Sequence, residues 1–469
     1  VLEPIIITDT HARWVLENKG ILSKDSVLQF QLKVPTAQKG KGFLPLGAGI
    51  YGLIKSAVLR CGATRINSIQ DLAYFKTMTH SYDSPSFRTN VTRLLKGINN
   101  SLIPAALAPD LSGAGTFIPA GVEQLVEGEA ELDYQLAITD SGDDTPCFSI
   151  RLSELFPVLL DIELPLFMLN DEVAIELTFN TQNDKDQNTG GVGTICCFKD
   201  NAGAADKAAC NIVKESCLLY LDTITYNNER MEEVAASVNA REGLFLDFTD
   251  VIQNFASIPA IPSLSKTASE MTSQTRTHQL PLSGFQVKNV FWGYHVQDNT
   301  PKTTPATTPP TDYRFYNELL GKYQLLAYQK DDSWDIRVND MLILPQSLES
   351  ATMKAAECEN VYGSQVWLNQ GLYSFNPMVN KTGLHAVNAN GDLFPAKTQF
   401  VLFGGSDTQA LRAGQHFAAV NLSHGWGDDN DDAILIDSKP IEVIHNTLPV
   451  SPDFNFDRVT YYFSEVVKR

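Results

Sequence analysis

The stretch FSIRLSELFPVLLDIELPLFMLNDEVAIELTFNTQ runs from Phe148 to Gln182 and carries the clearest structural pattern in the chain. In its last part, VAIELTFNT (Val173 to Thr181), apolar and polar residues alternate between turn-forming residues. A period of two with leucine, β-branched and aromatic residues is typical of a half-buried β-strand. The stretch therefore predicts a protein built mainly from β-sheet.

The same alternation recurs in both halves of the chain. Further strands are predicted at Ser26–Val34, Cys217–Tyr226, Ser283–Val296, Gln324–Gln329, Trp334–Leu344, Gln399–Gly404, Gln415–His424 and Asp457–Lys468. Helical patterns are few and lie at Ser68–Tyr82, Ser86–Ile98 and Ser347–Gly363. Because no series of alternating strands and helices runs along the chain, a doubly wound parallel sheet is disfavoured.

The alternation stops at NNERMEEVAASVNARE (Asn227 to Glu242), a polar stretch that we interpret as a link between two similar halves. We place the boundary near Val238, which predicts an N-terminal domain at 1–237 and a C-terminal domain at 238–469. Two polar or Thr/Pro-rich stretches, Phe179–Gly193 and Asp298–Asp312, are predicted as long loops, one in each half.

Composition limits the possible functions. The chain has 469 residues, of which 43% are hydrophobic and 19% are charged, enough to bury a core in each of two domains. The net charge of -19 without a long Lys/Arg block argues against a dedicated nucleic-acid-binding surface. Residues 1 to 65 nevertheless hold nine basic and four acidic side chains. Scattered surface lysines explain this best, and contact with nucleic acid or an anionic membrane stays open.

The seven cysteines are too few and too scattered for a disulfide framework, so we expect mostly free thiols. Cys196, Cys197, Cys210 and Cys217 cluster, but their spacing matches no zinc signature. A local disulfide among these four remains open.

Three other patterns could carry chemistry, and each favours a structural interpretation. GAGIYG (Gly47 to Gly52) has the spacing of a dinucleotide-binding loop, but no hydrophobic strand directly precedes it, so a tight turn between strands is preferred. Asp428, Asp429, Asp431 and Asp432 lack the spacing of an EF-hand loop and indicate a solvated turn, with ion binding left open. Neither H-E-x-x-H nor G-x-S-x-G occurs. We therefore predict no catalytic residue, no cofactor site and no metal site.

No run approaches the roughly 20 apolar residues of a membrane helix, and no charged-then-apolar leader is visible. We expect a protein made inside the cell. The chain starts at Val1, which we interpret as the result of trimming or processing.

The stretch Phe148 to Gln182 resembles the first jelly roll of major capsid proteins from the virophage and Polinton-like virus group. In that group a Leu-Phe-Pro segment, a Leu/Pro bend and an I-E-L-x-F strand follow one another. Here they are Leu155–Pro157, Leu164–Leu166 and Ile175–Phe179. The stretches Gly49–Met78 and Ser438–Thr447 are similar to the group more weakly.

The resemblance implies an all-β double jelly roll with a few short inserted helices, acting as a major capsid protein of a DNA virus. It implies a pseudo-hexameric homotrimer that self-assembles with neighbouring capsomers into an icosahedral virion inside the host cell. Implied partners are penton and minor capsid proteins, with indirect contact to genome or inner membrane. It implies no enzymatic activity, cofactor or small-molecule substrate.

Two other classes of function stay open from the residues alone. One is a viral spike or lectin-like β-sandwich, in which Trp292, Trp334, Trp367 and Trp426 stack on carbohydrate, although tryptophans more often fill a core. The other is a glycosidase with paired carboxylates such as Glu129 and Glu131.

Overall fold

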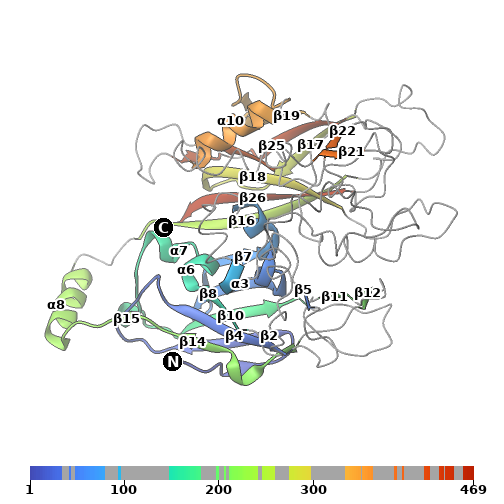
Figure 1. Ribbon diagram of the computed structural model, residues 1–469. Coiled ribbons are helices and arrows are strands. Elements are labelled where there is room, and N and C mark those ends of the chain that lie inside the picture. The colour runs from blue at the N-terminus through green and yellow to red at the C-terminus, as the bar shows by residue number, and fades with distance from the viewer. Residues whose placement is uncertain are drawn as a thin grey trace.

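The computed structural model shows two β-sandwiches, one formed by each half of the chain (Figure 1). The residues that it describes are 1–33, 42–43, 48–79, 93–96, 147–180, 197–199, 205–206, 211–240, 246–258, 274–296, 333–349, 351–362, 385–387, 393–395, 417–422, 433–437, 439–447 and 458–468.

The first sandwich has eight strand positions that pair in nested order. In chain order they are the single residue Leu2 and strands β2 (His11–Leu16), β4 (Val27–Lys33), β6 (Ile54–Cys61), β7 (Thr64–Gln70), β8 (Cys147–Arg151), β10 (Val173–Phe179) and β14 (Leu218–Tyr220). The first pairs with the eighth, through Leu2 and Leu219. The second pairs with the seventh, the third with the sixth and the fourth with the fifth, all antiparallel.

The second sandwich repeats this order. Its strands are β16 (Phe248–Ile258), β17 (Gln274–Leu280), β18 (Gln286–Val296), β19 (Ser333–Val338), β20 (Met341–Leu342), β23 (Phe417–Asn421), β25 (Ile441–Thr447) and β26 (Arg458–Lys468). The pairs are β16 with β26, β17 with β25, β18 with β23, and β19 with β20. A long hairpin wound up in this way is a jelly roll. The predicted fold class, all-β with two tandem jelly rolls and short helices, is confirmed.

The remaining elements are short. The strands are β1 (Ile6–Ile7), β3 (Ile21–Leu22), β5 (Gly42–Phe43), β9 (Leu164–Pro165), β11 (Cys197–Lys199), β12 (Ala205–Asp206), β13 (Asn211–Ile212), β15 (Thr223–Ile224), β21 (His385–Val387), β22 (Leu393–Pro395) and β24 (Ile434–Leu435). The helices are η2 (Gly49–Leu53), α1 (Leu72–Thr79), α3 (Arg93–Lys96), α6 (Leu152–Leu155), α7 (Val158–Asp161), η6 (Leu166–Met168), η7 (Lys214–Ser216), α8 (Asn228–Asn239) and α10 (Ala351–Tyr362). None of the helices described is long and apolar enough to span a membrane.

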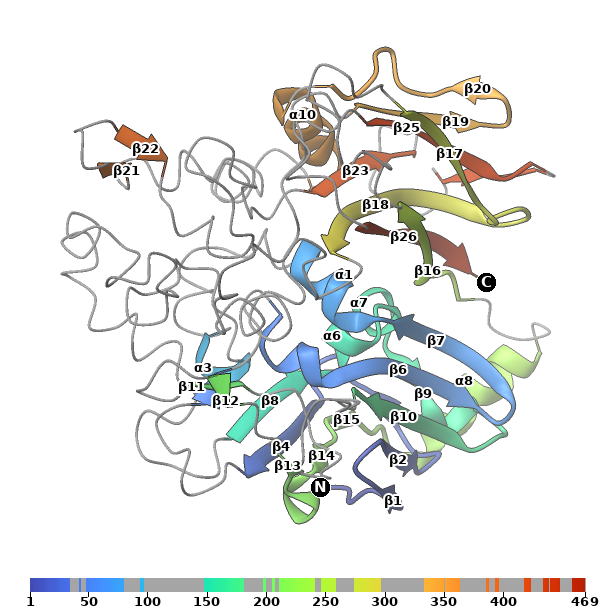
Figure 2. The ribbon, with the colours of Figure 1, turned by 90° about the vertical axis from the view of Figure 1, so that its right-hand side faces the viewer.

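Nested antiparallel pairing sends alternate connections to opposite ends of each sandwich. The connection from the fourth to the fifth strand is a tight turn in both, Gly62–Ala63 and Asn339–Asp340. Gly62, Asn339 and Asp340 all have positive φ, as tight hairpin turns require. Figure 2 shows both turns at the same end of the strands, which we call the turn end. The opposite end, which we call the loop end, is the origin of the long connections 71–146, 180–217, 297–332 and 343–416.

Most strand predictions are confirmed, and the differences have physical reasons. The stretch Cys217–Tyr226 forms two strands, β14 and β15, and Trp334–Leu344 forms the hairpin β19–β20. The polar link Asn227–Glu242 contains α8, whose Asn227 side chain accepts a hydrogen bond from the Arg230 backbone N–H at 3.0 Å. The predicted strands Gln324–Gln329 and Gln399–Gly404 lie outside the described residues.

Helix predictions are confirmed in part. The stretch Ser68–Tyr82 begins as the end of β7 and then forms α1, and Ser347–Gly363 contains α10. Of Ser86–Ile98, the described residues form the short helix α3. The strands of the first sandwich end at Ile224 and those of the second begin at Phe248. The predicted boundary at Val238 therefore falls inside α8.

Candidate assembly site between the two sandwiches

The two sandwiches share one hydrophobic cluster. The four-stranded sheet β16-β26-β18-β23 covers the core of the second sandwich with one face and contacts the first sandwich with the other. Its contacting residues are Val251, Phe291, Ala419 and Phe463, which join the first-sandwich cluster. A sheet that is apolar on both faces gives a continuous contact between the two halves.

Helix α1 supplies the aromatic side of this contact. The Phe75 ring is 4% exposed, and its centroid lies 5.2 Å from that of Phe463 and 6.3 Å from that of Phe291. Tyr74 stacks on Tyr461 with the ring centroids 4.1 Å apart. Aromatic pairs at these distances add to the energy of area burial. The contact thus has the character of a protein core.

Polar groups at the edge of the contact fix how the sandwiches meet. The Asp250 carboxylate, on β16, is fully buried and accepts hydrogen bonds from Asn67 Nδ2 at 2.8 Å and from the Ser68 backbone N–H at 3.3 Å. Lys468 forms an ion pair with its other oxygen. Asp161 Oδ2, on α7, accepts a hydrogen bond from the Thr249 backbone N–H at 2.7 Å. Directional bonds of this kind allow few orientations of one sandwich on the other.

The stretch that opened the sequence analysis contributes helices α6 and α7 to the core of the first sandwich. Leu155, Phe156, Val158 and Leu159 are buried in its core. Beside them, Glu154 accepts a hydrogen bond from the Tyr51 hydroxyl at 2.9 Å and pairs with the buried ammonium of Lys96. Burial raises the pKa of Glu154, but the neighbouring cations and the Tyr51 hydroxyl outweigh it and lower the pKa overall.

Comparison with known proteins adds the following. No protein-family model matches the chain, and no curated protein matches its sequence. Among solved structures, the match to the Sputnik virophage structure covers 99% of this chain and 84% of the matched chain, with 10% identity and a TM-score of 0.49. The match to the Faustovirus major capsid protein covers 100% of this chain and 89% of that protein's chain, with 10% identity and a TM-score of 0.48. The match to the mavirus major capsid protein covers 99% of this chain and 86% of that protein's chain, with 10% identity and a TM-score of 0.45. These scores are low, so the fold assignment rests on the nested strand pairings.

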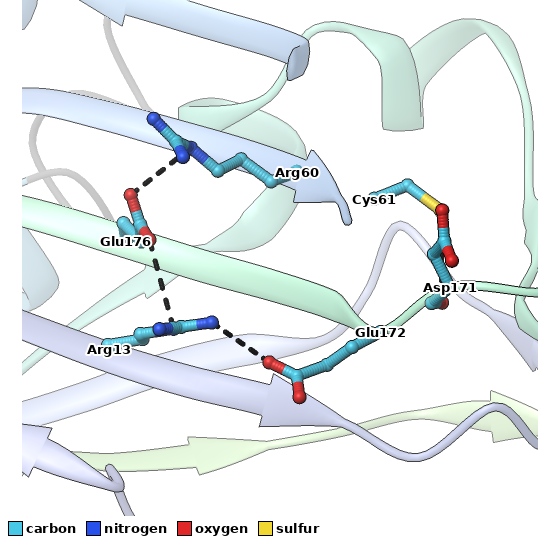
Figure 3. A network of polar contacts seen from close by, with 6 residues as sticks. All are labelled: Arg13, Arg60, Cys61, Asp171, Glu172 and Glu176. Atoms are coloured by element: carbon cyan, nitrogen blue, oxygen red, sulfur yellow. Dashed lines mark hydrogen bonds and ion pairs between the residues drawn. The ribbon is translucent and has the colours of Figure 1, made fainter. Parts of the chain in front are cut away.

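The exposed face of the first sandwich has a different character from the shared contact. Figure 3 shows Arg13 between Glu172 and Glu176, with Arg60 on the far side of Glu176. The ion-pair distances are 2.9 Å for Arg13 to Glu172 and 3.3 Å for Arg60 to Glu176. These residues lie on or beside strands β2, β10 and β6, and the two arginines belong to the basic segment 1–65. Two of its cations are therefore paired on the sheet surface, and the described strands of this segment, such as β2, β4 and β6, are part of the sandwich.

The residues considered for chemistry lie apart. Trp292 and Trp334 are fully buried, with ring centroids 6.4 Å apart, so the interpretation that they stack on sugar is wrong. Gly49 to Leu53 form a 3₁₀ turn, and the next residues form strand β6 in place of the helix that a dinucleotide loop requires. Trp367, Trp426, Glu129, Glu131 and Asp428 to Asp432 lie outside the described residues.

The described cysteines Cys61, Cys147, Cys217 and Cys358 are thiols outside any disulfide, as predicted. Burial raises the pKa of Cys217 to about 12, which keeps it protonated and unreactive. Cys196 and Cys210 lie outside the described residues, as does the side chain of Cys197. Within the described part of the chain, no group of three or more His, Cys, Asp or Glu residues could hold a metal ion.

Sequence reasoning did not single out Asp250, Asn67 or Phe75. One signal was available, because six of the nine residues of VTYYFSEVV (Val459 to Val467) are apolar and they do not alternate strictly with polar ones. Such a run is typical of a strand buried on both faces. It indicated that something covers the outer face of β26, without saying what.

The second sandwich is expected to lose stability in acid through His278. This side chain borders a hollow of about 280 Å³ between β16 and β17. Burial, His445 and Arg276 lower the pKa of His278 to about 4. Below pH 6.5 the unfolded chain takes up a proton that the folded chain does not, so stability falls as the pH drops from 6.5 toward 4.

His278→Gln should remove this pH dependence. Between pH 7 and pH 5 the wild type should lose on the order of 1 kcal/mol of unfolding free energy relative to the variant. Denaturant titrations at both pH values measure it, and equal losses in the two proteins would contradict the prediction. Glu465 changes stability in the opposite sense, since burial raises its pKa, but it is present in both proteins and cancels in the comparison.

Proposed function

We propose that this chain is the major capsid protein of an icosahedral DNA virus, a structural subunit without enzymatic activity. The observation that carries the proposal is the nested jelly-roll order found twice, in two sandwiches that point the same way and are joined by one hydrophobic cluster. Jelly rolls are a fold of viral capsid proteins and of lectins. Two rigidly joined copies favour the capsid, because three chains then supply six similar blocks around a ring.

In this proposal the domains are residues 1–237 and 238–469, and the subunit forms a pseudo-hexameric homotrimer. The sandwiches stand upright, so that contacts between chains close the ring and weaker contacts between capsomers tile the shell. The partners are further copies of the chain, penton proteins and minor capsid proteins, with indirect contact to the genome or an inner membrane. The protein is then part of the virion and is assembled inside the host cell.

Sedimentation equilibrium of the purified chain, with negative-stain imaging of the same sample, tests the proposal. A mass near three times 51.7 kDa with six-lobed, hexagonal outlines is the expected result. A chain that stays monomeric at all concentrations, or that forms only dimers, would sink it. The lectin-like alternative predicts binding on a glycan array, whereas the capsid proposal does not require it.

A further inference from the structure

Helix α8 stands apart from both sandwiches (Figure 1). None of its described side chains is buried, although Met231, Val234, Ala235 and Val238 form an apolar stripe along one face. Their spacing of three and four residues is that of a helix face that packs against a partner. Val234 is 40% exposed. A helix of this length, roughly 18 Å, is marginal in water unless its apolar face is covered.

A second exposed apolar surface lies on the second sandwich, around its tight turn. Met341 and Leu342 of β20 are 67% and 56% exposed, and Leu435 of β24 is 52% exposed. Asn339 ties the turn to this segment, since its side chain donates a hydrogen bond to the Leu435 carbonyl at 3.4 Å and accepts one from the Asp437 backbone N–H at 3.3 Å. We call these three apolar residues the turn-end patch.

The topology places α8 and the turn-end patch at the same level along the strand direction, near the turn end. The chain leaves the eighth strand of the first sandwich at the turn end, so α8 begins there, and the β19–β20 turn belongs to the same end of the second sandwich. Figure 2 shows α8 beside the first sandwich and β20 at the far edge of the second, both toward this end. When chains stand upright side by side, α8 of one chain is level with the patch of the next.

We infer that α8 binds a second copy of this chain, packing its apolar stripe against the turn-end patch of the neighbouring subunit. Two different surfaces on opposite parts of one chain make a head-to-tail contact, which closes into a ring when the rotation fits. The inference rests on the proposed capsomer, and it names which part of the chain joins neighbouring subunits.

Two substitutions of the same kind on α8 separate contact from helix stability. Ala235→Glu places a charge in the stripe, whereas Ala236→Glu places it on the exposed opposite face. Both change helix propensity equally. Measured by sedimentation equilibrium on the full chain, Ala235→Glu should raise the dissociation constant of the assembly about tenfold or more. Ala236→Glu should leave it within about twofold.

The partner surface is tested with Leu342→Lys, alone and combined with Ala235→Glu. Each single variant should weaken assembly, and the double variant should recover at least part of the loss, because opposite charges then meet across the contact. If the wild type forms trimers and Ala235→Glu assembles equally well, or if both glutamate variants fail alike, the inference is overturned and the capsomer stands. A wild type that never assembles overturns the proposed function itself.

Discussion

Replacing Phe75 with alanine should lower the free energy of unfolding by about 3–5 kcal/mol, the usual cost of removing a buried phenyl ring from a core. The ring is 4% exposed and lies against Phe291 and Phe463 of the other sandwich. Since it belongs to the shared contact, its loss should also uncouple the two halves. The unfolding curve should then change from one cooperative transition to two.

Guanidinium titration followed by tryptophan fluorescence measures this at one fixed chain concentration, because assembly also adds stability. Trp14 reports on the first sandwich, and Trp292 and Trp334 report on the second. Phe255→Ala is the matched control, since this ring is 70% exposed and its loss should cost less than about 0.5 kcal/mol. A loss below about 1 kcal/mol for Phe75→Ala would show that the contact is not a core.

Replacing Asp250 with alanine should cost about 2–4 kcal/mol. The carboxylate is fully buried, and its removal takes the partner from the partly buried Lys468 ammonium and leaves the buried Asn67 amide with only its longer hydrogen bond, to the Thr249 carbonyl at 3.3 Å. An orphaned polar group in a core carries its full desolvation cost. Asp250→Asn should lose less, because an amide oxygen can still accept the hydrogen bond from Asn67.

The control is Asp9→Ala, which removes an ion pair to Lys214 in which both side chains are about half exposed. Such pairs contribute about 0–1 kcal/mol, so the control should remain close to the wild type. Denaturant titration compares all three variants. Equal losses for Asp250→Ala and Asp9→Ala would contradict the role of the carboxylate in fixing the contact.

The fold could be predicted because its strands are local patterns. Alternation at Val173–Thr181 and in the second half indicated strands wherever one face is buried and the other is wet. Helix α8 was missed because the link looked polar, and only its three- and four-residue spacing from Met231 to Val238 pointed to a helix. The apolar stripe of a helix is hard to recognise in a sequence when charged residues stand between its members.

The candidate site could not be predicted in the same way. Asp250 is one of many acidic residues in the chain, and its burial depends on Asn67, which is 183 residues away in sequence. Phe75 lies in a predicted helix, but nothing local tells which sheet it meets. Pairings of this kind follow from the topology, and a single sequence carries no record of them.

The division of the molecule into a turn end and a loop end has an evolutionary consequence. The entropic cost of closing a connection grows only slowly with its length, so added residues at the loop end destabilise the fold little. The two tight turns at the turn end have no such freedom, because they are set by backbone angles at Gly62, Asn339 and Asp340. Insertions and deletions can therefore accumulate at the loop end of this fold, while the two tight turns stay fixed in length by their geometry.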